Sequence, residues 1–200
     1  MESLYNKVMS TYKTIILDRD GIDILQTPEE ERVFEEQLEL IKDVEGELVE
    51  VGVYMGATAK KISEKFPDRI VYAFDTFEGF LESGSDKDGF ANYKVGDLKE
   101  ANLETVQSNL KNFPKINLIK GDFPLSGKIL NDKKIAFAHI DVDMYNPTKA
   151  TLNFILPKMA KGGIIIVHDY PAHDGVRLAV NEFNLKNLIV VGGRQGVIKI

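Results

Sequence analysis

The spacing of apolar residues predicts a helix near the start of the chain. Apolar residues recur every three or four positions, with glutamates between them, at Val33, Phe34, Leu38 and Ile41. That spacing gathers the apolar side chains on one helical face. Thr27, Pro28 and Glu30 precede the run as a capping box with proline at the first helical position. We predict an amphipathic helix that covers either the chain's own sheet or that of a second copy in a homodimer.

From Glu47 onward, β-branched apolar runs alternate with amphipathic segments. Such alternation is typical of an α/β fold with a parallel sheet and helices on both faces. The predicted strands are 48–52, 70–75, 116–121, 135–143, 164–169, 188–191 and 197–200. The predicted helices are 57–66, 98–113, 125–131 and 147–159. Asp97 with Glu100 marks the second helix start, and Asn146 before Pro147 marks the fourth.

The two ends of the chain differ from this regular middle. The last two apolar runs are joined by Gly-Gly-Arg-Gln-Gly, which predicts a hairpin and therefore an antiparallel last strand. Residues Lys13–Asp20 fit either a short strand or a loose arm. We divide the chain into an N-terminal helical arm, residues 1–45, and a ligand-binding domain, residues 46–200.

One long segment, Thr76–Gly96, has neither the helical nor the strand spacing of apolar residues. It carries glycines and aromatic residues among polar ones. Loops of this length in compact domains are usually functional lids or disordered. The aromatic residues Phe77, Phe80, Phe90 and Tyr93 favour a loop that closes on a ligand.

Composition and charge exclude several classes of function. The 200 residues include no cysteine, which excludes disulfides, thiolate metal sites and a cysteine nucleophile. The formal net charge of −6 argues against a nucleic-acid partner, which normally requires a basic surface. Met1–Lys13 lacks the apolar core of a signal peptide, and no stretch approaches the ~20 apolar residues of a membrane span. We therefore expect a cytoplasmic protein that acts on a small molecule.

The carboxyl ends of the first three predicted strands offer the parts of an adenosine site. Ligands of open parallel sheets bind beyond these ends. Gly52 and Gly56 follow the first strand, where they let a ligand approach the backbone. Asp75 ends the second strand, at the position of an acid that contacts ribose hydroxyls. Asp122 follows the third strand and can hold an adenine amino group while Phe123 packs on the ring.

S-adenosylmethionine fits these residues better than a dinucleotide does. Gly52-x-x-x-Gly56 lacks the middle glycine of Gly-x-Gly-x-x-Gly, through which pyrophosphate approaches the backbone. Glu50 adds an acid where the ammonium or sulfonium of S-adenosylmethionine is favoured. Taken singly, a glycine is also compatible with a plain turn and Asp75 with a cap, so an NAD-dependent oxidoreductase stays an alternative.

Acids and histidines at the next two strand ends predict a metal site. Asp141 and Asp143 lie two residues apart, on one side of the fourth strand, and His168 and Asp169 end the fifth. Adjacent strand ends bring Asp141, His168 and Asp169 to one corner. Carboxylates suit magnesium, whereas imidazole favours a transition metal. In the alternative interpretation, Asp143 only organises the following helix start.

Two other histidines have less specific positions. His139 lies in the middle of an apolar strand and is predicted to be a hydrogen-bonded core residue. His173 follows Pro171 and is either a surface loop residue or a base candidate near the crevice.

The strand-end motifs belong to a pattern that extends to the C-terminus. It comprises Val49–Gly56, Phe74–Phe80, His139–Tyr145, Val167–Tyr170 and Gly175–Val180. These segments resemble the macrocin O-methyltransferase family. The resemblance implies a Rossmann-like class I methyltransferase with a seven-stranded, mostly parallel sheet and an antiparallel last strand. It also implies S-adenosylmethionine- and magnesium-dependent methylation of sugar hydroxyls on macrolide and aminocoumarin antibiotics.

The resemblance also implies a cofactor site, a base and a metal site. The implied cofactor-binding residues are Glu50, Gly52, Tyr54, Gly56, Asp75, Thr76, Phe77, Asp122, Phe123 and Asp141. Asp141 is also the implied general base, and Asp141, His168 and Asp169 occupy the positions of metal ligands. His168 stands where the family has an aspartate, which leaves open a weaker magnesium site, a different metal or none. Met55 stands where an arginine is common.

Together these inferences predict an O-methyltransferase. A methyl group passes from the sulfonium to a hydroxyl of a sugar or glycosylated small molecule, while a metal lowers the pKa of that hydroxyl and Asp141 takes its proton. The departure at His168 favours the main alternative, a non-catalytic relative that binds an adenosine ligand.

Overall fold

A seven-stranded sheet forms the centre of the molecule. The structure is a computed structural model that describes residues 16–24, 26–89 and 91–200. The strands lie in the order β5-β4-β3-β6-β7-β9-β8. They are β3 (Glu47–Val51), β4 (Val71–Asp75), β5 (Ile116–Lys120), β6 (Ile135–Ile140), β7 (Met159–His168), β8 (Leu188–Val191) and β9 (Gln195–Lys199). β3 to β7 are parallel, while β9 is antiparallel to both β7 and β8, which confirms the predicted class of fold.

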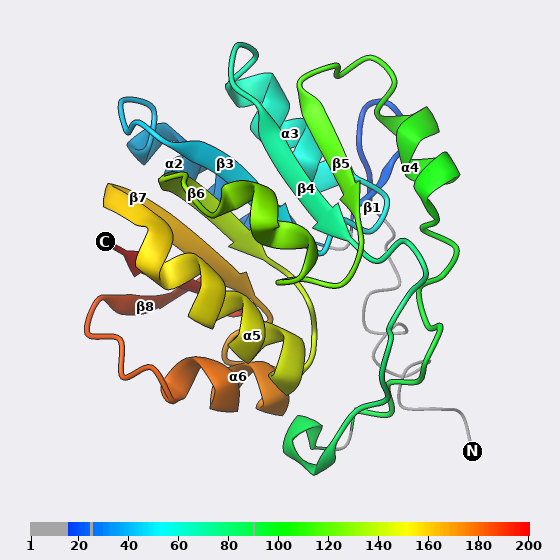
Figure 1. The fold of residues 1–200 in the computed structure, drawn as a ribbon, viewed down its shortest axis with the longest axis vertical. Coiled ribbons are helices and arrows are strands. Elements are labelled where there is room, and N and C mark those ends of the chain that lie inside the picture. The colour runs from blue at the N-terminus through cyan, green and yellow to red at the C-terminus, as the bar shows by residue number, and fades with distance from the viewer. Residues whose placement is uncertain (1–15, 25, 90) are drawn as a thin grey trace.

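Side-chain alternation along the central strands divides the core into two layers. In β7, Ile164 and Ile166 pack with α2 and α3, whereas Ile165 and Val167 pack with α5 and α6. Figure 1 shows these helices on the two sides of the sheet. The helices are α2 (Pro28–Leu40), α3 (Ala57–Lys65), α4 (Leu103–Asn109), α5 (Tyr145–Ile155) and α6 (Asp174–Asn181), with short 3₁₀ helices η1 (Asp86–Asp88), η2 (Ser126–Leu130) and η3 (Leu156–Lys158). Because both faces are covered, β6 is buried along its whole length.

The predicted N-terminal helix, α2, packs on the chain's own sheet. The backbone N–H of Glu30 donates to Thr27 Oγ1 (3.2 Å), and the N–H of Thr27 donates to Glu30 Oε2 (2.7 Å), which confirms the capping box. Phe34 and Leu38 are buried against the strands. The helix therefore covers the chain's own sheet, which is the first of the two predicted alternatives. The homodimer and the division of the chain at residue 45 stay predictions.

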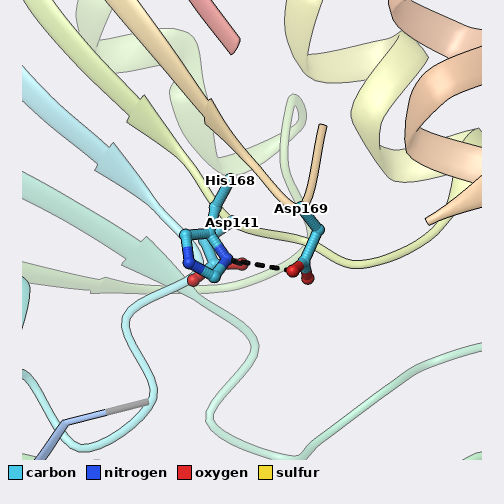
Figure 2. A group of neighbouring side chains, drawn as sticks. All are labelled: Asp141, His168 and Asp169. Atoms are coloured by element: carbon cyan, nitrogen blue, oxygen red, sulfur yellow. Dashed lines mark ion pairs between the residues drawn. The ribbon is translucent and has the colours of Figure 1, made fainter. Parts of the chain in front are cut away.

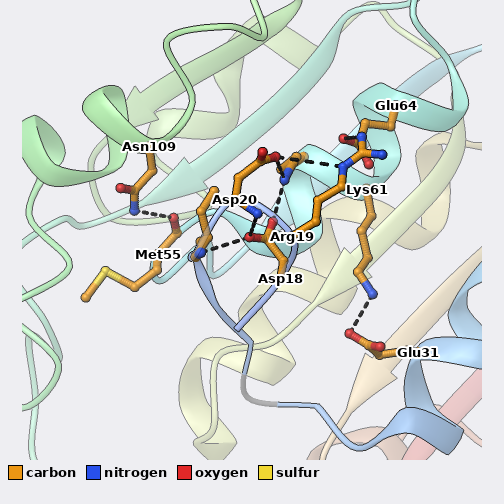
Figure 3. A network of polar contacts seen from close by, with 10 residues as sticks. Asp18, Arg19, Asp20, Glu31, Met55, Lys61, Glu64 and Asn109 are labelled. Atoms are coloured by element: carbon orange, nitrogen blue, oxygen red, sulfur yellow. Dashed lines mark hydrogen bonds and ion pairs between the residues drawn. The ribbon is translucent and has the colours of Figure 1, made fainter. Parts of the chain in front are cut away.

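A short hairpin before α2 is attached to α3. β1 (Ile16–Leu17) pairs antiparallel with β2 (Asp23–Ile24), so a strand is present within the predicted segment Lys13–Asp20, whose first residues lie outside the described ones. The buried Lys60 of α3 forms an ion pair with Asp18 in the hairpin turn (2.5 Å). Figure 3 shows the polar contacts around this turn. They attach the hairpin turn to α3.

The predicted second helix start is wrong. α4 begins at Leu103, where Asn102 caps the helix by accepting a hydrogen bond from the backbone N–H of Thr105 (3.0 Å). The predicted start at Leu98 fails because Leu98 has a φ of +69°, in the left-handed region.

The predicted fourth helix start is also displaced. α5 begins at Tyr145, whose backbone N–H donates to the Asp88 carboxylate (2.7 Å). The side chain of Asn146 donates to Glu82 Oε1 (3.0 Å) and does not cap the helix. The segment predicted as helix 125–131 is the 3₁₀ helix η2, and α6 is a helix that the sequence analysis did not assign.

Candidate active site

A cavity of about 740 Å³ opens beyond the carboxyl ends of the parallel strands. The predicted site residues that line it are Gly52, Tyr54, Asp75, Thr76, Asp122, Phe123, Asp141, His168 and Asp169. They come from the ends of β3, β4, β5, β6 and β7. Glu50, Gly56 and Phe77 are not among the lining residues. The topology therefore gathers most of the predicted residues at one place.

Glycine at position 52 is required by a close backbone contact. Gly52 has a φ of +88°, and a Cβ atom there would lie 1.7 Å from the carbonyl oxygen of Asp141. Gly56 has a φ of +92° and directly precedes α3. Gly52 thus allows the β3–α3 loop to lie against the strand end that carries Asp141.

Asp75 orders the same loop through its carboxylate. Its Oδ2 accepts hydrogen bonds from the backbone N–H groups of Val53 (2.7 Å) and Tyr54 (3.2 Å). Its Oδ1 accepts from the N–H of Phe77 (2.8 Å). A carboxylate has about four lone-pair sites, so these bonds leave acceptor capacity toward the cavity. The ribose contact of Asp75 stays a prediction.

Met55 lies in this loop and lines the cavity. Its backbone oxygen accepts a hydrogen bond from Asn109 Nδ2 at the end of α4 (3.0 Å), as Figure 3 shows. The methionine places an uncharged side chain at this point of the cavity wall. Among the lysines and arginines of the described residues, Arg194 alone lines the cavity.

Phe123 lines the cavity and is held in place by two other aromatic rings. Its ring packs edge-on against Phe74 and Phe154, with centroids 5.1 Å apart in each pair. Asp122 precedes it and also lines the cavity. An acid beside a rigid aromatic ring is compatible with the predicted adenine contact.

Glu50 and His139 form a closed pair in the core. Each side chain is 1% exposed, and Glu50 Oε1 lies 3.0 Å from His139 Nδ1. Burial, followed by the negative charges of Asp141 and Asp75, raises the pKa of Glu50 well above its usual value, and burial lowers the pKa of His139 to about 4. His139 is thus a hydrogen-bonded core residue, as predicted. Glu50 faces His139 instead of the cavity, because successive residues of β3 point to opposite faces.

Asp141, His168 and Asp169 lie together at one corner of the cavity (Figure 2). His168 Nδ1 is 3.3 Å from Asp141 Oδ1 and 3.4 Å from Asp169 Oδ1. The side chain of Asp141 is 31% exposed, whereas those of His168 and Asp169 are 4% exposed. Asp141 is therefore the member of this corner that a ligand in the cavity reaches most easily.

The charges at this corner are strongly coupled. Burial opposes ionisation of Asp141, but His168 outweighs burial and lowers the pKa of Asp141 to about 2. Burial likewise opposes protonation of His168, but Asp141 and Asp169 outweigh it and raise the pKa of His168 well above its usual value. Burial and repulsion from Asp141 and Asp169 raise the pKa of Asp143. The corner therefore stabilises positive charge between its carboxylates.

The geometry of this corner fits a divalent cation. One ligand atom from each of Asp141, His168 and Asp169 lies within 4.8 Å of the others. A second such group consists of Asp143, Asp169 and His173. Two carboxylates and an imidazole are an ordinary ligand set for a divalent metal.

Arg194 reaches the same corner and was missed by the sequence analysis. Its guanidinium forms an ion pair with Asp169. Burial lowers the pKa of Arg194 to about 10, which still leaves it charged at neutral pH. The predicted hairpin contains this arginine, but the sequence does not show which residue of the neighbouring strand it faces.

The loop over residues 76–96 lines the cavity and contacts α5 and α6. Tyr93 Oη lies 2.9 Å from His173 Nδ1, and Phe80 packs edge-on against Tyr93. His173 directly precedes α6, lines the cavity and also lies 3.2 Å from Asp169 Oδ2. Phe90 lies outside the described residues. These contacts connect the loop to the acidic corner, while its closure on a ligand stays a prediction.

The sequence matches the family model of macrocin-O-methyltransferase (TylF) over residues 31–191. It is 28% identical over 174 residues to the demethyldecarbamoylnovobiocin O-methyltransferase of Streptomyces niveus, covering 78% of this chain and 66% of the relative. It is 27% identical over 157 residues to a tetracenomycin-C 4'-O-methyltransferase of Streptomyces olivaceus that acts on a dimethoxyrhamnosyl derivative, covering 72% of this chain and 60% of the relative. The matches thus span less than two thirds of each relative.

Solved structures show the same fold. The O-methyltransferase NovP has a TM-score of 0.74 at 22% identity, with 98% of each chain covered. The calicheamicin methyltransferase CalS11 has a TM-score of 0.65 at 24% identity, with 84% of this chain and 77% of the other covered. Within the described part of the chain, every helix is too short or too polar to cross a membrane. The cytoplasmic location stays a prediction.

Proposed function

The chain belongs to the macrocin-O-methyltransferase family, and we propose that it transfers a methyl group from S-adenosylmethionine to a hydroxyl of a sugar or glycosylated small molecule. The observation that carries this proposal is the arrangement of one cavity. Asp75, Asp122 and Phe123 line it at one set of strand ends, and Asp141 and Asp169 line it at the next. The named relatives support a glycosylated acceptor, because both are O-methyltransferases and the name of one specifies a rhamnosyl group on its substrate.

The cofactor is proposed to lie along the ends of β3, β4 and β5. In this arrangement Asp75 holds the ribose, Asp122 and Phe123 hold the adenine, and the loop from Gly52 to Gly56 holds the methionine moiety. Thr76 lies at the cavity beside Asp75. Glu50 and Phe77 do not line the cavity, so their contribution is indirect. Glu50 stabilises the carboxyl end of β3, and the backbone N–H of Phe77 donates a hydrogen bond to the carboxylate of Asp75.

Asp141 is proposed to accept the proton of the acceptor hydroxyl. The oxygen of that hydroxyl forms a bond to the methyl carbon as the carbon–sulfur bond breaks, and the hydroxyl proton passes to an Asp141 carboxylate oxygen. The low pKa of Asp141 keeps it ionised at neutral pH, and its partial exposure makes it accessible to the acceptor. A carboxylate of such low pKa is a weak base, so the hydroxyl must also be acidified.

A divalent cation is proposed as the source of that acidification. Asp141, His168 and Asp169 would hold it, and the bound ion would lower the pKa of a hydroxyl in contact with it. His168 must be neutral to act as a ligand, so its proton is released on metal binding. The two carboxylates favour magnesium, while the imidazole makes manganese a suitable probe.

The experiment combines a binding assay with a transfer assay. Calorimetry with S-adenosylhomocysteine tests the cofactor site, and labelled S-adenosylmethionine with a panel of glycosides tests transfer, each with magnesium and with a chelator. We expect binding in both conditions and faster transfer with magnesium. Absence of S-adenosylhomocysteine binding would contradict the proposal as a whole. Binding without transfer to any glycoside would favour the non-catalytic relative.

A further inference from the structure

Arg194 is held at the acidic corner by the backbone, which makes its place there a property of the fold. The antiparallel register of β7 and β9 pairs His168 with Gln195. Arg194 precedes Gln195 and Asp169 follows His168, so antiparallel pairing places Arg194 next to Asp169. Gly192 and Gly193, with φ of +59° and +78°, form the turn that leads into Arg194.

Both carboxylate oxygens of Asp169 already face nitrogen atoms of other side chains. Oδ1 contacts the guanidinium of Arg194 and lies 3.4 Å from His168 Nδ1. Oδ2 lies 3.2 Å from His173 Nδ1. A divalent ion that uses Asp169 as a ligand would therefore share this carboxylate with a guanidinium that is charged at neutral pH, and like charges at such separations repel.

The carboxylate of Glu30 is a second possible ion-pair partner for Arg194. Arg194 Nε lies 3.7 Å from Oε1 of Glu30, whose side chain is fully buried in α2. The other oxygen of Glu30 is fixed by the capping box. The guanidinium thus lies between a carboxylate of the metal corner and one that belongs to the N-terminal helix.

We propose that Arg194 is a built-in competitor of the divalent cation: it neutralises Asp169 in the metal-free protein and must turn toward Glu30 when a metal binds. This inference rests on the metal part of the proposed function. It assigns Arg194 a positioning role, because the residue acts through Asp169. Metal affinity is then set by the exchange of Arg194 between two carboxylates as well as by the ligand set.

The test is a manganese titration of the full chain with saturating S-adenosylhomocysteine, followed by the paramagnetic resonance signal of free Mn²⁺. The variants are Arg194→Gln, which removes the competing charge, and Arg194→Lys, which keeps it. Arg177→Gln is the matched control, because it removes one positive charge from an exposed arginine that pairs with Asp174 and does not line the cavity. Unchanged S-adenosylhomocysteine affinity shows that each variant is folded.

We expect Arg194→Gln to bind Mn²⁺ at least tenfold more tightly than the wild type, with Arg194→Lys and Arg177→Gln within threefold of it. Equal or weaker binding by Arg194→Gln would overturn the inference while leaving the metal proposal intact. A tenfold gain in Arg194→Lys would also overturn it, because packing rather than charge would then be responsible. Absence of Mn²⁺ binding in every variant would overturn both the inference and the metal site, whereas methyl transfer would still be judged separately by its own assay.

Discussion

Two pairs of histidine and carboxylate lie on neighbouring strands of this sheet and behave in opposite ways. His139 faces the single carboxylate of Glu50, and both are sealed in the core. His168 lies between Asp141 and Asp169, at the cavity, with its ring centroid 6.2 Å from that of His139. Burial lowers the pKa of His139 to about 4, whereas the two carboxylates overcome burial and raise the pKa of His168.

The difference shows what separates a structural pair from a site that can take a cation. Burial raises the pKa of Glu50 and lowers that of His139, so it disfavours charge on both members of this hydrogen-bonded core pair. Two carboxylates beside one imidazole favour its charged form, and an opening to the cavity gives an ion or a hydroxyl access to Asp141. The same residue types thus serve packing within the core and chemistry at the carboxyl ends of the strands.

Removing the charge of Asp141 should have the largest effect. We expect Asp141→Asn to lower the rate of methyl transfer by about 10²–10⁴-fold, the usual contribution of a positioned proton acceptor. S-adenosylhomocysteine should still bind. Glu50→Gln is the control, since it keeps a neutral hydrogen-bonding group, and comparable loss in both variants would erase the contrast between the two pairs.

The two histidines should give stability profiles of opposite slope. His139 has a depressed pKa, so between pH 6.5 and 4 the unfolded state binds a proton that the native state does not; its contribution is present above that range and falls by about 3 kcal/mol as the pH drops. His168 has a raised pKa, so its contribution is present below about pH 6.5 and is lost as the pH rises through its folded pKa.

Urea unfolding of the wild type, His139→Gln and His168→Gln in chelator, from pH 4 to 9, measures both slopes. The wild type should gain stability relative to His139→Gln as the pH rises, and lose it relative to His168→Gln. Parallel slopes in the two differences would contradict the assignment.

Truncating Glu50 should cost stability without abolishing the site's chemistry. We expect Glu50→Ala to lose about 2 kcal/mol, because it leaves His139 buried without its partner, and Glu50→Gln to lose much less. Urea denaturation with constant m-values measures the difference. A smaller loss in the alanine variant than in the glutamine variant would contradict the hydrogen-bonding role of Glu50.

The smallest effect is expected from the loop above the acidic corner. Tyr93→Phe removes the hydroxyl that lies 2.9 Å from His173, a contact worth about 1 kcal/mol. We expect a KM for the acceptor raised about fivefold, with S-adenosylhomocysteine affinity unchanged by calorimetry. An altered cofactor affinity with an unchanged KM would place the loop over the cofactor rather than the acceptor.

The sequence predicted the seven strands of the sheet and most of the residues at the cavity, because strand periods and strand-end positions are local signals, whereas α6 was not predicted. The predictions failed for features that depend on contacts between neighbouring elements. Glu50 has the right position in the chain but points to the other face of β3. Leu98 was predicted to begin a helix, but it lies in a turn and has a left-handed backbone.

The position of Arg194 could not be predicted because it depends on strand register. The hairpin that carries it was predicted, yet the register that places it beside Asp169 depends on pairing between β7 and β9. Register is fixed by tertiary packing as well as by the turn, so the charge composition of the corner could not be known from the sequence.

The most direct test of the central claim is the position of the transferred methyl group. Wild-type protein is incubated with methyl-labelled S-adenosylmethionine, magnesium and the glycoside panel, and the product is mapped by carbon NMR. We expect label on a sugar oxygen, present with Glu50→Gln and lost with Asp141→Asn. Label on any other atom, or equal product from wild type and Asp141→Asn, would contradict it.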